Sequence, residues 1–144
     1  MTVLQALTKV RFMTFRIYVR ALISNPQGEI LMVLKQSNQS IAGGKWLLPG
    51  GVVEFGETPA DALARELREE ANFIIMDHAI LATETIMLNG VHWLGLYYRT
   101  NGETEAISNL EPEKHLRLEW CSVEFAKENL SAEVSGILSE AHKS

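Results

Sequence analysis

The chain has 144 residues and a mass of 16.1 kDa, which suits one domain with its own hydrophobic core and is short for two. Its apolar fraction of 47% and charged fraction of 22% are typical of a soluble globular protein and argue against intrinsic disorder. The formal net charge of -5 argues against tight, sequence-independent binding to a nucleic-acid polymer. A small anionic ligand remains compatible with this charge if a metal ion supplies positive charge locally.

Cysteine content and hydropathy predict the compartment. Cys121 is the single cysteine, so the chain cannot form an internal disulfide or a cysteine-rich zinc site. The segment 1–15 lacks the long apolar run of a signal peptide, and no stretch approaches the roughly 20 apolar residues of a membrane span. We therefore predict a cytoplasmic protein without a membrane partner.

The first part of the chain predicts strands joined by polar segments. Residues 15–23 alternate in polarity, as in a strand with one buried face. A Pro- and Gly-containing turn is predicted at 25–28, and the apolar run 30–34 fits a strand covered on both faces. Residues 36–44 are predicted to form a loop before a short apolar segment at 46–48.

The second half of the chain predicts a hairpin, a strand and a final helix. Asn89-Gly90 joins two strand-like runs, which is the strongest short-range signal for a β-hairpin. The predicted elements are strands at 79–88, 91–100 and 116–120, a loop at 101–114 and a helix at 131–142 capped by Ser131. Together with a central helix, these elements indicate a mixed sheet covered by helices.

That central helix is predicted over residues 58–71. Thr58 is a good N-cap, and Pro59 suits the first helical position. Apolar residues recur at intervals of three and four and form one face: Ala60, Leu63, Ala64, Leu67 and Ala71. The helix therefore has a buried face with polar flanks.

Three acids lie on the flank of this helix. Glu66, Glu69 and Glu70 are neighbours on the helix surface, and like charges at this spacing repel. A cation between them would remove the repulsion, and their hard oxygen ligands suit Mg²⁺ or Mn²⁺. On its own the pattern also fits a solvated acidic face paired with Arg65 and Arg68.

The segment before the helix favours the metal interpretation. Leu48-Pro49-Gly50-Gly51 leads towards the helix N-terminus, and paired glycines let the backbone approach a metal or a phosphate closely. Glu57 and Arg65 could form an ion pair that ties this loop to the helix.

Residues 51–73 resemble the signature of the Nudix hydrolases. The matching pattern is Gly51, five residues, Glu57, seven residues, Arg65-Glu66, an apolar Leu67, Arg68, Glu69-Glu70 and Ala71, within 23 consecutive positions. The family has glycine where this chain has Asn72, and Asn tolerates the left-handed conformation expected there. The resemblance implies an α/β protein with a Nudix-type α/β/α sandwich and a mixed central sheet, forming one domain over 1–144.

The resemblance also implies roles for individual residues. Glu66, Glu69 and Glu70 would hold Mg²⁺ or Mn²⁺, and the backbone carbonyl of Gly50 would add a ligand. Glu57 and Arg65 would form the ion pair that orients the helix. The cations would bridge phosphate oxygens and activate the attacking water.

The carboxylate that accepts the proton of this water varies within the family. Glu69 and Glu70 are candidates, and so are acids of the late loop: Glu103, Glu105, Glu111 and Glu113. We favour Glu111, because Glu111-Pro112-Glu113-Lys114 resembles a segment of members that act on nucleoside triphosphates. A solvated loop acid is the alternative for each of the four.

Residues outside the signature contribute weaker predictions. Arg16 and Arg20 share a strand face with Tyr18 and could bind substrate phosphate, with an exposed sheet edge as the alternative. The aromatic residues Trp46, Trp93 and Tyr97 could stack on a base, although core packing is the commoner role in strands. The histidines 78, 92, 115 and 142 show no metal-ligand spacing, and none is assigned a role.

The leading functional interpretation is a pyrophosphohydrolase that cleaves a phosphoanhydride bond in a nucleoside di- or triphosphate or a derivative. A nucleoside-diphosphate-sugar hydrolase is the second enzymatic interpretation. A Nudix-fold nucleotide-binding module without turnover is the third, and the complete set of acids favours an enzyme. The partner would be a small nucleotide, and segment 1–14 is predicted to add a strand or a contact in a homodimer.

Overall fold

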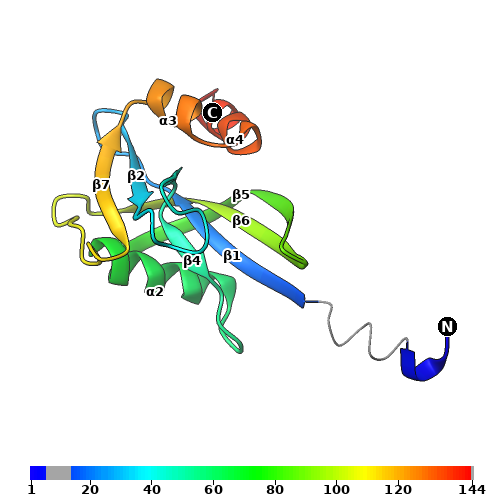
Figure 1. Ribbon diagram of the computed structural model, residues 1–144. Coiled ribbons are helices and arrows are strands. Elements are labelled where there is room, and N and C mark those ends of the chain that lie inside the picture. Colours follow the sequence, from blue (N-terminus) through cyan, green and yellow to red (C-terminus); the bar gives the residue numbers. More distant parts are fainter. Residues whose placement is uncertain (6–13, 144) are drawn as a thin grey trace.

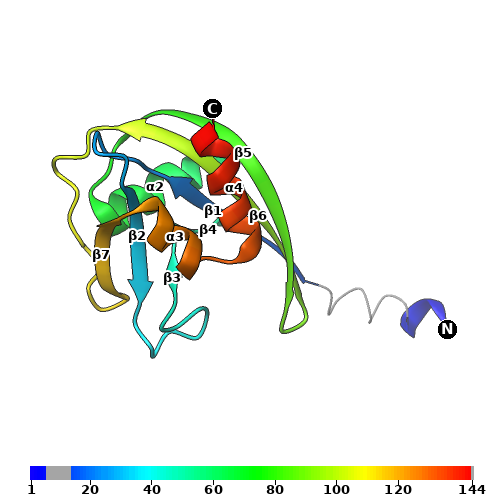
Figure 2. The ribbon, with the colours of Figure 1, turned by 90° about the horizontal axis from the view of Figure 1, so that it is seen from above.

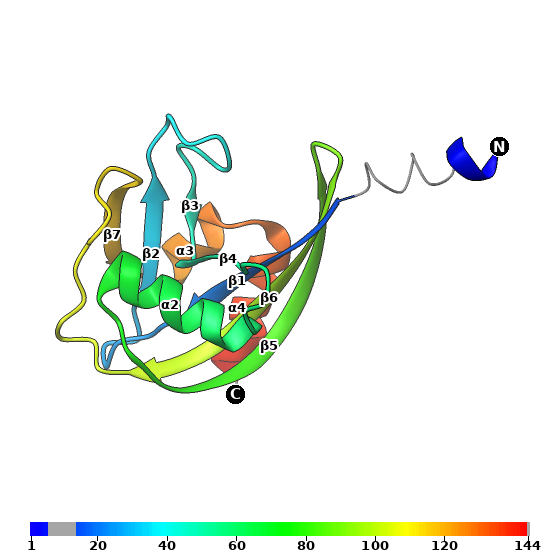
Figure 3. The ribbon, with the colours of Figure 1, turned by 90° about the horizontal axis from the view of Figure 1, so that it is seen from below.

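The computed structural model describes residues 1–5 and 14–143. Its strands lie between helix α2 (Pro59–Ala71) on one side and helices α3 (Val123–Asn129) and α4 (Ala132–Lys143) on the other (Figure 1). Two opposite views show the layers: α3 and α4 lie in front of the strands in Figure 2, and α2 lies in front of them in Figure 3. This arrangement is the predicted α/β/α sandwich.

The larger sheet has four strands in the order β4-β1-β6-β5. Its strands are β1 (Thr14–Leu22), β4 (Gly50–Val52), β5 (Ile75–Leu88) and β6 (Val91–Gly102). Strand β1 is parallel to β6 and antiparallel to β4, and β5 is antiparallel to β6. The sheet is therefore mixed, as the sequence predicted.

A smaller antiparallel sheet completes the strand layer. It contains β3 (Trp46–Leu47), β2 (Ile30–Lys35) and β7 (His115–Cys121), in the order β3-β2-β7. Alternate residues of β2 face the two sides: Leu31 packs with the α2 side and Met32 with the side of α3 and α4. Both faces of β2 are covered, which confirms the prediction made from its continuous apolar run.

The prediction that the first strand has one buried face is wrong. Val19 and Ala21 are fully buried on the side of α2, but Tyr18 and Leu22 are also buried on the opposite side. Phe15, which was placed on the buried face, is 72% exposed. The second face is buried because Tyr18 and Leu22 belong to a separate core that includes residues of α3 and α4.

Two further local predictions need correction, and one helix was not predicted. Strand β5 begins at Ile75 rather than at residue 79, because an edge strand tolerates the polar residues Asp77 and His78. Gly50–Val52 is a strand rather than a loop. Helix α3 was missed because seven residues are too few to show an apolar period, although Ser122 accepts a hydrogen bond from the Phe125 N–H as an N-cap.

Several turn and cap signals are confirmed. Asn89 and Gly90 both have positive φ angles, of 50° and 77°, as a tight hairpin turn requires. Thr58 accepts a hydrogen bond from the Asp61 N–H at 3.1 Å and caps α2. Asn72 adopts the left-handed conformation at the end of α2, with φ 55° and ψ 35°, as predicted for the position where the family has glycine.

Helix α2 packs its apolar face against the large sheet. Leu63, Leu67 and Ala71 are fully buried there and form one core with Val19 and Ala21 of β1. Burying a leucine side chain stabilises the fold by roughly 1.5–3 kcal/mol, so this face holds the helix in a fixed orientation. The acidic flank of α2 is consequently held against strand β4.

The N-terminal segment and the expected lack of a membrane span are considered only over the residues that the structure describes. The segment 1–14 was predicted to add a strand or a dimer contact, but residues 6–13 lie outside the described part of the chain. Within the described ranges, no helix has both the length and the apolar character needed to cross a membrane.

Asn72 provides a test of the helix end. We expect Asn72→Ala to lower the free energy of unfolding by about 1–2 kcal/mol, because alanine is strained in the left-handed region. The Asn72 side chain also donates a hydrogen bond to the Ala106 carbonyl at 3.0 Å, which alanine would lose. Asn72→Gly should lower the free energy of unfolding by less than half as much. Glycine also removes the side-chain hydrogen bond, but it adopts the left-handed conformation without strain. Urea unfolding measures both, and equal losses would contradict this account.

Candidate functional site

The site begins at the contact between helix α2 and strand β4. The Glu70 side chain points inward and its residue is only 5% exposed, although it belongs to the acidic flank of α2. Its carboxylate accepts a hydrogen bond from the backbone N–H of Gly50 at 3.1 Å. Burial raises the pKa of Glu70 to about 8; the nearby Arg20 guanidinium opposes this rise, and the Glu66 and Glu111 carboxylates add to it.

The two glycines of β4 make room for this contact in different directions. A Cβ atom on Gly50 would overlap the carbonyl oxygen of Val19 in β1, and the φ of Gly50 is +152°. A Cβ atom on Gly51 would overlap the carboxylate of Glu66 in α2. Glycine is thus required at one position by the neighbouring strand and at the other by the helix.

Arg65 connects the helix to the preceding segment, as predicted. Its guanidinium donates two hydrogen bonds to the Glu57 carboxylate, at 2.8 and 2.9 Å, and one to the Val52 carbonyl at 3.2 Å. This bidentate pairing lowers the pKa of Glu57 to about 2 and raises the pKa of Arg65. Glu57 and Arg65 therefore fix the position of α2 relative to β4.

Glu66 and Glu69 also contact Arg65. Its Nη1 atom lies 3.0 Å from Glu66 and 3.4 Å from Glu69. The Glu66 side chain is 17% exposed and its pKa is raised by burial, whereas the Glu69 side chain is 53% exposed. The three predicted acids therefore differ: Glu70 is enclosed, Glu66 is at the site, and Glu69 is at its outer rim. Part of the repulsion between them is compensated by Arg65.

Glu111, in the turn before β7, and His115, the first residue of β7, lie close to Glu70. Glu70, Glu111 and His115 each place one oxygen or nitrogen atom within 4.8 Å of the others. The His115 Nε2 atom is 3.9 Å from the Glu70 carboxylate, and its Nδ1 atom is buried without a hydrogen-bond partner among the described residues. Burial lowers the pKa of His115, so a neutral imidazole faces the acids. Glu111, the loop acid favoured from the sequence, thus lies beside Glu70.

His115 was missed, since no histidine was assigned a role. Its backbone N–H donates to the Glu111 carbonyl at 2.9 Å, so the two residues are four apart on one tight turn. The pattern Glu111-Pro112-x-x-His115 could have indicated this proximity, because proline favours such a turn. Glu103 and Glu105 are exposed and do not line the cavity described next.

Glu66, Glu70 and Glu111 line one end of a cavity of about 1550 Å³, whereas the predicted metal ligand Glu69 does not line it. Positive side chains lie at the same end: Arg20, Lys35 and Lys114. Arg20 donates a hydrogen bond to the Leu48 carbonyl at 3.3 Å, and Lys114 pairs with Glu111 at 3.1 Å. Of these cations only Arg20 was predicted from the sequence. Arg16, also predicted, lines the cavity further out, with its guanidinium 5.0 Å from the centre of the Trp93 ring.

The other end of the cavity contains a hydrogen-bonded triad. The hydroxyls of Tyr18 and Tyr97 donate to the same oxygen of Glu84, at 2.6 and 2.9 Å. Burial and the bond to Glu84 raise the pKa of Tyr18, and burial is the main cause that raises the pKa of Tyr97 to about 12, so both hydroxyls remain donors. No role was predicted for Glu84 from the sequence. Tyr97 and Trp93 are buried, in agreement with core packing, but they also line the cavity together with Trp46, so stacking on a base stays a prediction.

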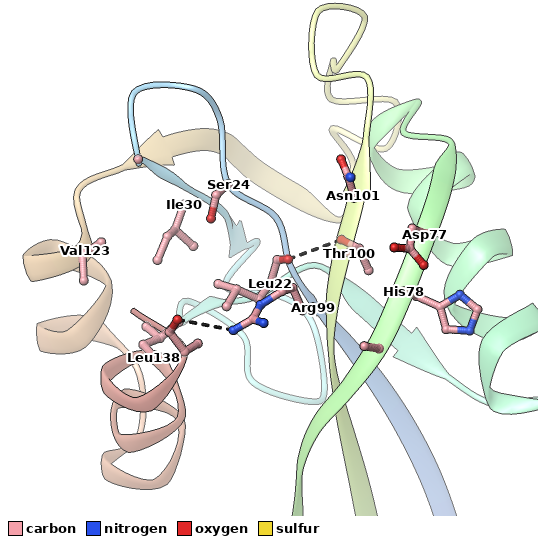
Figure 4. A pocket seen from close by; sticks show the side chains of 13 residues that line it. Leu22, Ser24, Ile30, Asp77, His78, Arg99, Thr100, Asn101, Val123 and Leu138 are labelled. Atoms are coloured by element: carbon pink, nitrogen blue, oxygen red, sulfur yellow. Dashed lines mark hydrogen bonds between the residues drawn. The ribbon is translucent and has the colours of Figure 1, made fainter. Parts of the chain in front are cut away.

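A second cavity, of about 500 Å³, is separate from this site (Figure 4). It lies between the start of β2, strands β5 and β6, and helix α4. Arg99 donates to the Ala141 carbonyl at 3.3 Å, and the Thr100 hydroxyl donates to the Leu22 carbonyl at 3.3 Å (Figure 4). The two cavities share no lining residue, and none of the predicted site residues lines the smaller one.

Comparison with known proteins identifies the family. The family model of the NUDIX domain matches residues 14–139. The chain belongs to the Nudix family. Two solved Nudix structures are similar to it: the MutT protein of Methanosarcina mazei Go1, with a TM-score of 0.79, 24% identity and coverage of 90% of this chain and 94% of that one, and a MutT Nudix hydrolase of Burkholderia pseudomallei, with a TM-score of 0.70, 26% identity and coverage of 82% and 88%. They confirm the predicted fold class.

Curated Nudix relatives match a shorter region. An 8-oxo-dGDP phosphatase of Mus musculus is 34% identical over 76 residues, which are 53% of this chain and 22% of that protein. An RNA pyrophosphohydrolase of Acinetobacter baylyi is 35% identical over 71 residues, which are 49% of this chain and 39% of that protein. The aligned region thus covers less than half of the length of either relative.

The ion pair of Glu57 provides a pH-dependent test. Because its pKa falls from 4.5 to about 2 on folding, its stabilisation is complete above pH 4.5 and is lost as the pH falls through 2. We expect Glu57→Gln to destabilise the protein most above about pH 5, with a difference from the parent that shrinks steadily on acidification. Urea unfolding at several pH values measures this difference. A destabilisation that does not change with pH would contradict the role of the pair, and Glu105→Gln is the exposed control.

Proposed function

We propose that the protein is a divalent-metal-dependent hydrolase that cleaves a phosphoanhydride bond in a nucleoside di- or triphosphate or a derivative. The observation that supports this proposal most is the enclosed Glu70 carboxylate, which faces Glu111 and His115 at the end of the cavity where Arg20 lies. Membership of the Nudix family and the names of the curated relatives support the same reaction class.

The residues at this end of the cavity fit a hard divalent cation. Carboxylates and a backbone carbonyl are the ligands that Mg²⁺ and Mn²⁺ prefer. Burial and the two neighbouring carboxylates disfavour the charged form of Glu70, and a cation would reverse this effect. We propose that Glu66, Glu69 and Glu70 hold the metal together with the carbonyl of Gly50. Glu69 would act from the rim, since its side chain is the most exposed of the three.

When bound, the cation would neutralise charge on the phosphate and lower the pKa of an attacking water. Residues of the chain would bind the phosphate, accept a proton and position helix α2. Arg20 and Lys35 are placed to bind phosphate oxygens, because both line the cavity near Glu70. Glu111 is our candidate to accept the proton of the water at a carboxylate oxygen. Arg65 and Glu57 would keep α2 in position without touching substrate.

Other substrate classes and one other function are rivals to this proposal. A nucleoside-diphosphate sugar is the second candidate substrate, and the 5′ end of an RNA, as in the name of one relative, is a rival to the proposed small-nucleotide substrate. A nucleotide-binding module without turnover is the rival from another class, and the complete set of acids argues against it. A cytoplasmic location and action on small nucleotides rather than polymers are part of the proposal.

We expect Glu70→Gln to lower kcat at least about 100-fold, because an amide is a poor ligand for a hard cation and bears no charge. The fold should persist, since the glutamine oxygen can still accept the Gly50 N–H. Released phosphate or pyrophosphate is measured over a panel of nucleotides with Mg²⁺ or Mn²⁺. Asp61→Asn, an exposed change in the first turn of α2, is the matched control. Near-parental turnover by Glu70→Gln would contradict the role of Glu70 in holding the metal, and no turnover by the parent on any substrate would favour the binding-module interpretation.

Metal removal gives an independent test. We expect a chelator to abolish hydrolysis, and added Mg²⁺ or Mn²⁺ to restore it, because the enclosed acids cannot stabilise an anionic transition state without a cation. The rate is followed by product release before and after dialysis against EDTA. Full activity after dialysis would contradict the metal dependence.

A further inference from the structure

The end of the cavity opposite the acids contains a carboxylate in an unusual setting. Tyr18, Gly95 and Glu84 are paired in one row across strands β1, β6 and β5. Gly95 has no side chain, and a Cβ atom there would overlap the Tyr18 ring. The missing side chain therefore lets the Tyr18 ring cross the middle strand and place its hydroxyl on Glu84.

This row leaves one Glu84 oxygen available. Both tyrosine hydroxyls donate to Oε1, so that oxygen is occupied by two hydrogen bonds. Within the described part of the chain, Oε2 has no hydrogen-bond partner. Glu84 lines the cavity, so Oε2 can accept from a ligand there. The tyrosines hold the carboxylate in place, because each is buried and anchored in the core.

The surroundings favour a ligand with an apolar face beside its polar groups. Ile86 and Leu88 follow Glu84 on the same face of β5, line the same cavity and are 38% and 42% exposed. Apolar walls with a few precisely placed polar groups are typical of small-molecule sites, and a nucleobase, with two apolar faces and a polar edge, suits such walls. A cationic ligand is disfavoured, because the guanidinium groups of Arg16 and Arg20 already lie over the Trp93 and Tyr18 rings, at 5.0 and 5.6 Å.

Arg20 lies between the two ends of the cavity and interacts with residues of both. It lies over the Tyr18 ring on one side, and its charge acts on Glu70 on the other. A nucleotide whose phosphates meet Arg20 would therefore extend its base towards Glu84. This placement rests on the proposed function, because it assumes that the ligand is a nucleotide.

We propose that Glu84 determines base specificity by accepting hydrogen bonds at Oε2 from the Watson–Crick edge of guanine. Guanine presents two adjacent donors there, N1–H and the N2 amino group. Adenine and cytosine place a ring-nitrogen acceptor beside their amino group, and uracil places a carbonyl on each side of its N–H, so each would bring a lone pair towards the carboxylate. A base that leaves this carboxylate unpaired, or repels it, loses binding free energy.

The test uses mononucleotides, which have no anhydride bond to cleave. Binding of GMP, IMP, AMP, CMP and UMP is measured by titration calorimetry in EDTA. We expect the parent to bind GMP at least about tenfold more tightly than IMP, which lacks only the N2 amino group, and than the other three, since a hydrogen bond to a charged group contributes at least this much. Similar affinities for all five ligands would overturn the proposal.

Glu84→Gln provides the second arm. The glutamine oxygen can still accept from both tyrosines, while its amide nitrogen presents donors where Oε2 stood. GMP affinity should fall at least about tenfold and UMP affinity should hold or rise. Glu105→Gln, an exposed loop change, should bind like the parent. Retention of the GMP preference by Glu84→Gln would overturn the proposal. If that variant does not fold, the comparison of GMP with IMP in the parent decides alone.

This experiment separates the inference from the proposed function. Hydrolysis of several nucleotides without a binding preference for GMP would leave the proposed function standing and remove the role of Glu84. A Glu84-dependent preference for GMP in a protein without turnover would keep the base site and remove the hydrolase.

Discussion

The close approach of strand β4 to helix α2 is the constraint on which the rest of the site depends. Gly50 must lack a side chain because β1 lies against it, and Gly51 must lack one because the Glu66 carboxylate occupies that space. Only at this separation can the buried Glu70 reach the Gly50 N–H. Arg65 maintains the separation by bonding both to the Val52 carbonyl of β4 and to Glu57 in the loop between the two elements.

The consequence of this contact is a carboxylate that is costly to ionise without a partner. An enclosed acid beside two other acids is destabilised as an anion by burial and by like charge. This end of the cavity therefore attracts positive charge. Arg20 supplies some of it, but the pKa of Glu70 remains raised. The proposed cation and the substrate phosphates would complete the balance. At the opposite end, the Glu84 carboxylate differs from that of Glu70, because it accepts hydrogen bonds from the hydroxyls of Tyr18 and Tyr97.

Local signals in the sequence predicted the elements that depend on local chemistry. The cap at Thr58, the left-handed Asn72 and the Asn89-Gly90 turn are set by neighbouring residues, and all three are confirmed. The signature also placed Glu57 with Arg65. Residues brought together by tertiary structure were harder to predict: His115 meets Glu70 only because β7 pairs with β2, and Tyr18 meets Glu84 only because β6 between them has a glycine. No pattern along one segment encodes such cross-strand contacts.

The central claim is that the geometry of the glycine pair positions the acids for a cation, and Mn²⁺ binding measured by electron paramagnetic resonance tests it most directly. Gly51→Ala should displace the Glu66 carboxylate and weaken Mn²⁺ binding by about tenfold or more, as changes that misplace a metal ligand do. Gly136→Ala is the matched control, because a Cβ atom at this α4 position has open space. The account predicts tight binding by the parent and by Gly136→Ala only. Equal Mn²⁺ binding by Gly51→Ala, or none by the parent, would contradict it.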